Sequence, residues 1–199
     1  MERSMRRLCF FSIFLIFLSG KLSAQEKFLK SITPDNIGLQ YAGSIGYMSL
    51  GVGYNLFKEK TNLSFHYGYV PEIKGGELHI AAVKFEYKPF AIRISDKIVF
   101  HPVNPVIFAS YTFGKNFGFK FDRDIYAKGY YFLSPALREH LGLSSEIKIL
   151  GDKTSKIKSI SLYAEANTND LYLISWFENR TTTPLPYIFQ MGFGVRMNF

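Results

Sequence analysis

Residues 186–199 read PYIFQMGFGVRMNF, and this stretch decides the fold. Every odd position from Tyr187 to Phe199 is apolar, while polar residues or glycine hold the even positions except Ile188. A period of two over so many residues predicts a β-strand whose two faces meet different surroundings. At the edge of an open sheet, such a strand would expose unpaired backbone groups and invite aggregation. A closed barrel has no edge, so the pattern favours a barrel.

The first residues of the chain predict a secretory signal peptide. Three arginines precede an apolar run over residues 8–18, and small residues lead to Ala24, after which we expect cleavage. The apolar run is too short to span a bilayer. The single cysteine, Cys9, lies within it, so no disulfide is expected in the mature chain. We therefore expect a signal peptide over residues 1–24 and one domain over residues 25–199.

Charge and composition narrow the class of the mature domain. The signal peptide carries four basic residues and one acidic residue (4 − 1 = 3), so its removal lowers the formal charge from +8 to +5. The remaining charges of both signs are interspersed, which predicts no nucleic-acid partner. Aromatic residues make up 17% of the chain, yet no mature segment is apolar over the length of a transmembrane helix. An exported chain of this kind can still span a membrane as a closed barrel.

Alternation elsewhere in the chain predicts about eight strands. They cover residues 37–46, 48–56, 63–69, 78–88, 106–114, part of 130–150, 159–167 and 186–199. The alternation slips by one residue near Tyr47, and we interpret the slip as a turn between two strands, because one strand of about 20 residues would be twice what a bilayer needs. Prolines interrupt the alternation over residues 89–103. We therefore predict that this segment is a structured connection that contains a short strand pair.

These features together resemble the small outer-membrane β-barrels of Gram-negative bacteria, the OmpA/OmpX-like group. The resemblance covers nearly all of the mature chain and rests on the signal peptide, the period-two strands and the alternating C-terminal strand that ends on an aromatic residue. It implies an all-β, antiparallel up-and-down transmembrane barrel of about eight strands in the bacterial outer membrane. Its implied partners are outer-membrane lipids, periplasmic chaperones and the barrel-assembly machinery. In that family the machinery recognises the C-terminal pattern, which is matched here by Phe193, Val195, Met197 and Phe199.

The connections agree with this resemblance in all but one place. Barrels of the outer membrane have short periplasmic turns and long external loops. Turns near Lys58 and Gly151 are predicted to be short, and residues 115–128 and 167–185 are predicted to be long loops, the second with room for a short ladder of its own. Residues 89–103 are longer than a periplasmic turn should be. Arg123 and Lys128 lie among loop aromatics and are candidates for contact with lipopolysaccharide phosphates.

The polar faces of the strands predict a charged network inside the barrel. An eight-stranded barrel is just wide enough to be filled by side chains. The expected members are His66, Lys84, Glu86, Arg138, His140, Glu146, Lys148, Glu165 and Arg196. Charges of both signs in a narrow space are expected to pair, because an unpaired buried charge is costly. We therefore expect no open pore, and a structural or surface-interaction role.

Two other classes of function remain open at this point. Eight-stranded barrels that deacylate lipid A use Ser, His and Glu, for which the nearest candidates are His140, Ser144, Glu146, Ser161 and Glu165. The backbones of His140 and Ser144 would stand roughly 13 Å apart on one strand, beyond the reach of a nucleophile and its base. The second alternative is a secreted soluble barrel or sandwich that binds a small ligand, and its apolar faces would point inward.

No cofactor or metal site is predicted. The four histidines show neither a His-x-His nor a His-Glu-x-x-His spacing, and the mature chain has no cysteine. Gly51 and Gly53 are not followed by the third glycine and the helix of a nucleotide-binding loop.

Overall fold

The computed structural model describes residues 33–114, 117, 134, 136–152 and 154–199. The predicted signal peptide over residues 1–24 lies outside these residues, as do Arg123 and Lys128 and nearly all of the predicted loop 115–128. Residues 35–199 form one compact unit.

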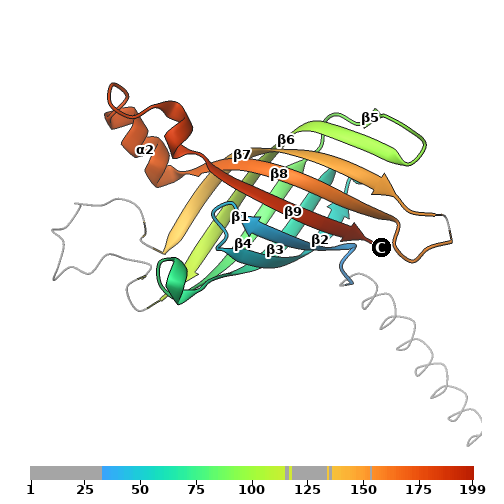
Figure 1. The fold of residues 1–199 in the computed structure, drawn as a ribbon, viewed down its shortest axis with the longest axis horizontal. Helices are drawn as coiled ribbons and strands as arrows, with labels where there is room; N and C mark the ends of the chain where they lie inside the picture. Colours follow the sequence, from blue (N-terminus) through green and yellow to red (C-terminus); the bar gives the residue numbers. More distant parts are fainter. Residues whose placement is uncertain (1–32, 115–116, 118–133, 135, 153) are drawn as a thin grey trace, which may run out of the picture. The chain divides into compact units, whose positions relative to one another are not determined.

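Eight antiparallel strands form the wall of a closed barrel, as predicted (Figure 1). They are β1 (Asn36–Ala42), β2 (Met48–Leu56), β3 (Thr61–Val70), β4 (Leu78–Tyr87), β6 (Ile98–Phe113), β7 (Leu137–Leu150), β8 (Ser159–Asn169) and β9 (Gln190–Asn198). Each strand of the wall pairs with the next, and β9 pairs with β1 to complete the ring. The sequence predicted this closure of the last strand against the first.

The register of the ladders gives the stagger of the barrel. Starting at Glu139 on β7, the paired residues can be followed once around the barrel, across each of the other strands of the wall in turn. The path returns to β7 at Ile149, ten residues further along (149 − 139 = 10). A closed barrel requires such a stagger together with tilted strands, and eight strands leave an interior that side chains can fill.

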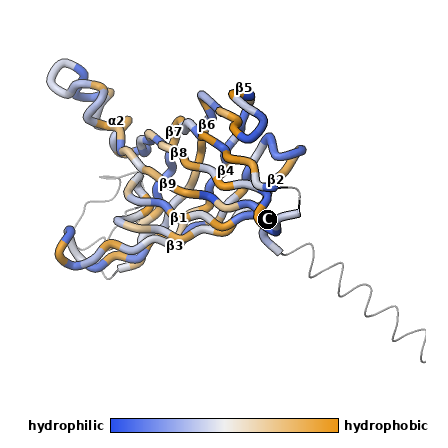
Figure 2. Tube along the Cα trace, turned by 45° about the vertical axis from the view of Figure 1, so that its right-hand side comes forward, coloured by the Kyte–Doolittle hydropathy of each residue, from blue (hydrophilic) through white to orange (hydrophobic). Residues whose placement is uncertain are grey.

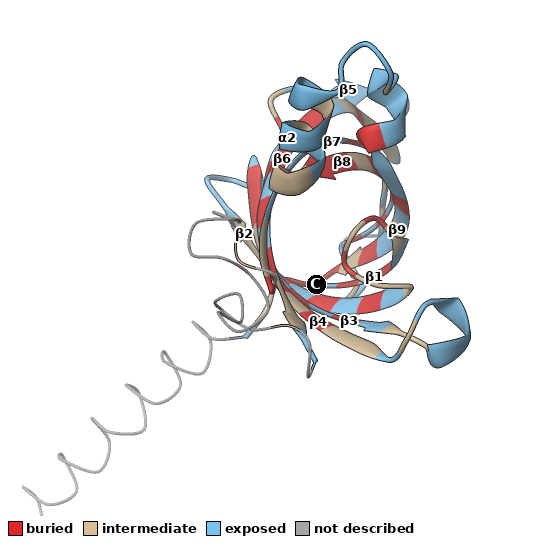
Figure 3. Ribbon diagram, turned by 90° about the vertical axis from the view of Figure 1, so that its left-hand side faces the viewer, coloured by how far each residue is buried: buried red, intermediate tan, exposed pale blue. Residues whose placement is uncertain are grey.

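Polarity is reversed relative to a soluble domain. Along the wall, outward residues are mostly apolar and exposed, and inward residues are mostly polar and buried (Figures 2 and 3). On β9, for example, Phe193 and Val195 are 55% and 42% exposed, whereas Arg196 is 5% exposed. This distribution follows from the alternation of side chains along a strand. Among the described residues, buried polar and charged side chains outnumber buried apolar ones.

The connections divide between two ends of the barrel. The loop end carries the connections 43–47, 71–77, 114–136 and 170–189, and the turn end carries 57–60, 88–97 and 151–158 together with Asp35 and Phe199. At the turn end the Phe199 backbone N–H donates to the Asp35 carbonyl oxygen over 2.9 Å. The predicted loop over residues 167–185 lies at the loop end, as the strand count requires.

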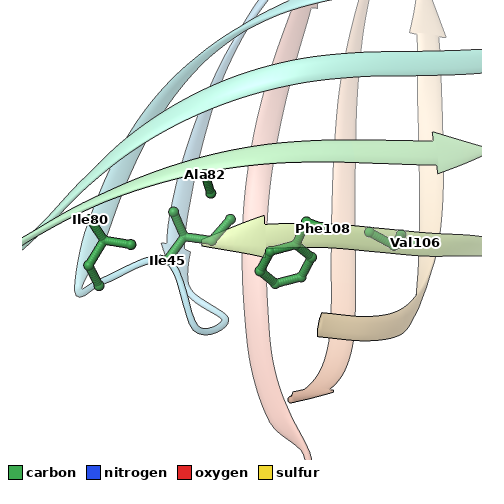
Figure 4. Close-up of a cluster of buried hydrophobic side chains, with 5 residues drawn as sticks. All are labelled: Ile45, Ile80, Ala82, Val106 and Phe108. Carbon is green, nitrogen blue, oxygen red and sulfur yellow. The ribbon is translucent and has the colours of Figure 1, made fainter. Parts of the chain in front are cut away.

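The slip near Tyr47 is a turn between β1 and β2, as predicted, and this turn folds into the barrel. Ser44 has a φ of 69°, and Ile45 at the tip is completely buried. A Cβ atom at Gly68 would overlap the Ile45 carbonyl oxygen, so a glycine on β3 makes room for the turn. Ile45 packs with Ile80, Phe108 and their neighbours in the apolar cluster of Figure 4.

Residues 89–103 contain the predicted short strand pair. Strand β5 (Ile92–Arg93) pairs with Val99 and Phe100, which belong to the start of β6. The predicted start of this strand at residue 106 is therefore wrong, because β6 already begins at Ile98. An irregularity in the ladder between His101 and Asn104 admits a proline that cannot donate a hydrogen bond.

The connection from β8 to β9 corrects a second expectation. Residues 170–178 form helix α2 (Asp170–Glu178) where a loop with a short ladder was expected, and a 3-10 helix η2 (Leu185–Ile188) takes the place of the start of the predicted last strand. The Asn169 side chain caps α2 by accepting a hydrogen bond from the Tyr172 N–H. Strand β9 consequently begins at Gln190, four residues after the predicted start. A further 3-10 helix, η1 (Glu72–Lys74), lies between β3 and β4.

In the part of the chain that the structure describes, no helix is long and apolar enough to cross a membrane.

Candidate functional site

Two glutamates and two cations form a compact cluster inside the barrel. Arg196 of β9 places Nη1 2.8 Å from Oε2 of Glu86 on β4 and 3.0 Å from Oε2 of Glu146 on β7. The Lys88 ammonium lies 2.7 Å from Glu146 Oε2 and 3.7 Å from Glu86 Oε2. All four side chains are at most 8% exposed. The cluster therefore connects three separate strands of the wall through the lumen.

Two serines complete the contacts of these carboxylates. Ser144 Oγ donates to Glu86 Oε1 over 2.6 Å, and Ser161 Oγ donates to Glu146 Oε1 over 2.8 Å. Charge-assisted hydrogen bonds of this kind are stronger than neutral ones. In each glutamate, the serine binds Oε1, whereas the cations contact Oε2.

A second ion pair lies closer to the loop end. Lys84 Nζ of β4 is 2.8 Å from Glu165 Oε2 of β8, and it donates to the Gln40 side-chain oxygen over 2.8 Å. The Tyr163 hydroxyl donates to the same Gln40 oxygen over 3.1 Å. Asn167 donates to Glu165 Oε1 over 3.1 Å. The Lys84 ammonium also lies over an aromatic ring, that of Phe108, at 5.2 Å.

The charges of this network balance. Three cations (Lys84, Lys88 and Arg196) face three carboxylates (Glu86, Glu146 and Glu165). Removing charges from water costs several kcal/mol per ion unless each charge is paired and hydrogen-bonded. The arrangement meets both conditions, and its side chains occupy the middle of the lumen.

The folded-in turn lies beyond this network towards the loop end. Asn167 donates to the Gly43 carbonyl oxygen over 3.0 Å and accepts from Ser44 Oγ over 2.7 Å. Because the turn contains residues in strained left-handed conformations, these contacts help to hold it. Ile45 at its tip places an apolar side chain above the charged layer.

An amide layer closes the network towards the turn end. Asn55 Oδ1 accepts from the side chains of Asn36 and Asn62 over 3.2 and 3.0 Å, and its Nδ2 donates to Asn198 over 3.2 Å. Asn198 donates in turn to Ser159 over 3.1 Å. Along the barrel, the interior is thus an apolar plug, a charged layer and an amide layer.

The nine residues predicted for the lumen occupy three kinds of position. Five belong to the ion-paired network: Lys84, Glu86, Glu146, Glu165 and Arg196. The two histidines, His66 and His140, are buried and contact serines instead. Arg138 lies 3.7 Å from Asp170 at the loop end, and Lys148 contacts Glu59 at the turn end.

Several members of the network are additional to those predicted. They are Gln40, Lys88, Ser144, Ser161, Tyr163 and Asn167. Lys88 continues the face of Lys84 and Glu86, so the alternation contained a signal for it. Tyr163 could be found on the polar face of its strand, opposite Gly194, where a Cβ atom would overlap its ring.

The serine and histidine contacts differ from the enzyme candidates considered above. Ser110 Oγ of β6 lies 2.8 Å from His140 Nε2 of β7. Ser144 instead contacts Glu86 and Asn104. The Ser110–His140 distance suits a nucleophile and its base, but the two residues are 3% and 6% exposed, and Phe108 stacks on the imidazole at 4.1 Å. His140 and Phe108 also line a groove that reaches the outer wall.

The turn end carries one ion pair with an electrostatic consequence. Lys148 Nζ donates to Glu59 Oε2 over 2.6 Å. This hydrogen bond, together with the charges of neighbouring lysines, lowers the pKa of the Glu59 carboxyl from its ordinary value, although burial acts in the opposite direction.

The residues predicted as an assembly signal lie on the outside of β9 or just after it. Phe193, Val195 and Phe199 are exposed, and Met197 is half-buried. The backbones of Phe193, Val195 and Met197 pair with β1 on one side and β8 on the other, and the Phe199 N–H donates to the Asp35 carbonyl oxygen.

Among the described residues there is no group of three or more His, Cys, Asp or Glu side chains that could hold a metal ion. Comparisons with models of known protein families, with curated proteins and with solved structures find no match for this chain.

Proposed function

We propose that this chain is an integral outer-membrane β-barrel protein with a filled lumen, which serves a structural or surface-interaction role. The observation that carries the proposal is the reversed polarity of the barrel. Its outer wall presents apolar side chains, whereas its interior holds one buried ion-paired cluster, one further buried ion pair and an amide layer. Such a surface suits hydrocarbon and is unfavourable in water.

The backbone supports the same proposal. In a hydrocarbon environment every backbone polar group needs a partner within the protein, and among sheets only closed barrels meet that need. The ring of ladders from β1 to β9 is complete. The exposed short β5 pairs with the part of β6 that extends beyond the wall at the turn end.

The geometry opposes the soluble alternative. A soluble ligand-binding barrel would turn its apolar faces inward, but here Leu39, Leu50 and Phe193 face outward at 47%, 59% and 55% exposure. The enzyme alternative rests on the Ser110–His140 distance alone, and both residues of that pair are buried.

The resemblance to outer-membrane barrels supplies the partners of the proposal. These are membrane lipids, lipopolysaccharide as a surface ligand, periplasmic chaperones and the barrel-assembly machinery. Phe193, Val195, Met197 and Phe199 are the proposed recognition residues for assembly.

The test is the behaviour of the mature protein during fractionation and electrophoresis. We expect recovery in the outer-membrane fraction and a heat-dependent shift in migration on a detergent gel. In a planar bilayer we expect no stable, large conductance, because the ion-paired side chains fill the lumen. A mature protein that is monomeric and freely soluble without detergent would refute the proposal, and a large steady conductance would refute the filled lumen.

A further inference from the structure

A groove of about 600 Å³ lies on the outer wall where helix α2 adjoins it. Strands β4, β6 and β7 form its floor, and Asp170 and Leu173 of α2 line it from the loop end. Two other grooves on the wall measure about 350 and 300 Å³, and strand residues alone line them. The helix is therefore what distinguishes this groove, and the volume of the groove falls within the ~300–1,000 Å³ of small-molecule sites.

The floor of the groove changes in polarity along the barrel. One row of paired outward residues is Val83, Ala109 and Glu139. The next row towards the turn end is Phe85, Ile107 and Leu141. The rows are two residues apart, or about 7 Å along a strand. The loop-side row thus includes a carboxylate, and the deeper row is wholly apolar.

Glu139 is the unusual member of this surface. Its side chain is exposed, and no hydrogen bond or ion pair joins it to any residue within the described ranges. Asp170, the other acid of the groove, lies 3.7 Å from Arg138. Ionisable residues on the membrane-facing side of a protein are costly and commonly mark a functional contact. A partner that presents a hydrogen-bond donor near Glu139 would reduce that cost.

Helix α2 gives the groove an apolar surround. Tyr172, Ile174 and Phe177 are 40%, 45% and 58% exposed, while Leu173 and Trp176 are half-buried. A helix with apolar residues on all sides is normally buried in protein or in a membrane. Its aromatic residues are of the kind found at the level of lipid head groups.

We propose that this groove binds one phospholipid of the surrounding leaflet, with a hydrocarbon chain along Phe85, Ile107 and Leu141 and an amine-bearing head group beside Glu139. The proposal rests on the outer-membrane location proposed above. The direction of the groove from carboxylate to apolar floor matches the direction of a lipid from head group to chain. A stable protein partner would need about 800 Å² of contact on this side, which is far more than one groove offers.

The selectivity of this site for one lipid must come from the shape of the groove and from the contact between the head group and Glu139. Within a bilayer an apolar surface gains nothing from the hydrophobic effect, since the surrounding chains are equally apolar. Packing of the chain against the small Ala109 on the floor, and the contact at Glu139, are the two features that bulk lipid cannot reproduce.

The first test fills the groove. We compare Ala109→Phe with the matched control Ala81→Phe, an outward alanine on β4 that does not line the groove. The full barrel is reconstituted in phosphatidylethanolamine vesicles, extracted in mild detergent, and its bound lipid is counted by native mass spectrometry. We expect the wild type and Ala81→Phe to keep one lipid, and Ala109→Phe to retain it about tenfold less, which corresponds to about 1.4 kcal/mol.

The second test needs no change in the groove and remains available if Ala109→Phe does not fold. Trp176 is the only tryptophan of the chain and lies one turn beyond Leu173 on the same side of α2. In vesicles of brominated phosphatidylethanolamine, bromine near the head group should quench its fluorescence more than bromine near the chain end. As a control, Phe65→Trp combined with Trp176→Phe places the single tryptophan on the outer wall at β3, away from the groove, where we expect quenching by the deeper bromines.

The outcomes separate this proposal from the one on which it rests. Equal lipid retention by Ala109→Phe and Ala81→Phe, or an unquenched Trp176, would overturn the lipid site while quenching at position 65 still supports a membrane barrel. A co-purified polypeptide that Ala109→Phe alone displaces would assign the groove to a protein instead. Absence of quenching at both tryptophan positions would refute the membrane location itself.

Discussion

The ion pair between Lys84 and Glu165 offers a quantitative test of the filled lumen. Their side chains are 2% and 1% exposed, and the two charges are 2.8 Å apart. The change Glu165→Gln removes one charge with little change in shape and leaves the Lys84 ammonium buried without its carboxylate. Removing one partner of a buried ion pair typically costs about 3–5 kcal/mol.

The structure places the expected cost near the lower end of that range. Lys84 keeps the Gln40 oxygen at 2.8 Å and the Phe108 ring at 5.2 Å after the change. We therefore expect a loss of about 3 kcal/mol. With a urea dependence of roughly 2 kcal/mol per molar, the unfolding midpoint should fall by about 1.5 M.

The measurement is urea unfolding of the refolded barrel in detergent micelles, followed by circular dichroism and by the heat-dependent gel shift. The matched control is Asp152→Asn, which breaks an ion pair of similar length, 3.0 Å to Lys97, whose side chains are 75% and 68% exposed. Exposed pairs contribute little to stability, so this control should leave the midpoint nearly unchanged.

A double variant completes the test. Lys84→Met with Glu165→Gln removes both charges, and it should be more stable than Glu165→Gln alone because no unpaired charge remains. If Glu165→Gln behaves like the exposed control, or if the losses of the two single changes simply add in the double variant, the two charges do not form the buried pair described here.

Three further outcomes are expected. Deletion of Phe199, or Phe193→Asp, should reduce the amount of folded protein recovered in the outer membrane before it changes any activity. The heat-dependent gel shift measures this amount, with the conservative Phe193→Leu as the control. Normal assembly of Phe193→Asp would contradict the proposed signal. Glu59→Gln should lower the unfolding midpoint at neutral pH. The pKa of Glu59 is lower in the folded protein than its ordinary value of about 4.3, so the ionised carboxylate stabilises the folded state above that pH, and this stabilisation is lost as the pH falls through the folded-state pKa. A difference in midpoint between wild type and variant that persists in acid would contradict this origin. Asn167→Ala should speed amide hydrogen exchange in residues 43–47, since about 1–3 kcal/mol of local hydrogen bonding is lost, and unchanged protection there would show that other contacts hold the turn.

The wall of the barrel was predictable because alternation acts on each strand separately. Residues 187–199 alternate almost without exception, and β9 does close against β1 as expected. The phase slip at Tyr47 correctly indicated a turn. The start of β6 was missed because its prolines argue against a strand, and the irregular ladder between His101 and Asn104 accommodates one of them, Pro102.

Contacts across the lumen were less accessible to prediction. Ser110 and His140 meet because β6 and β7 pair in one particular register, and thirty residues of chain separate the two. No local pattern specifies that register. Helix α2 was missed for a related reason: its apolar residues have no single face, so their spacing does not give the usual helical signal.

Arg196 adds a charge contribution to the pairing of the closing strand, β9. Among the described residues, the carboxylates of Glu86 and Glu146 would share only Lys88 as an ion partner without β9, which leaves one negative charge of the pair uncompensated. Docking of β9 completes the hydrogen-bonded ring and neutralises that charge in the same step. Closure is thereby coupled to charge compensation, which penalises partly assembled barrels and makes the final strand a checkpoint for the whole wall.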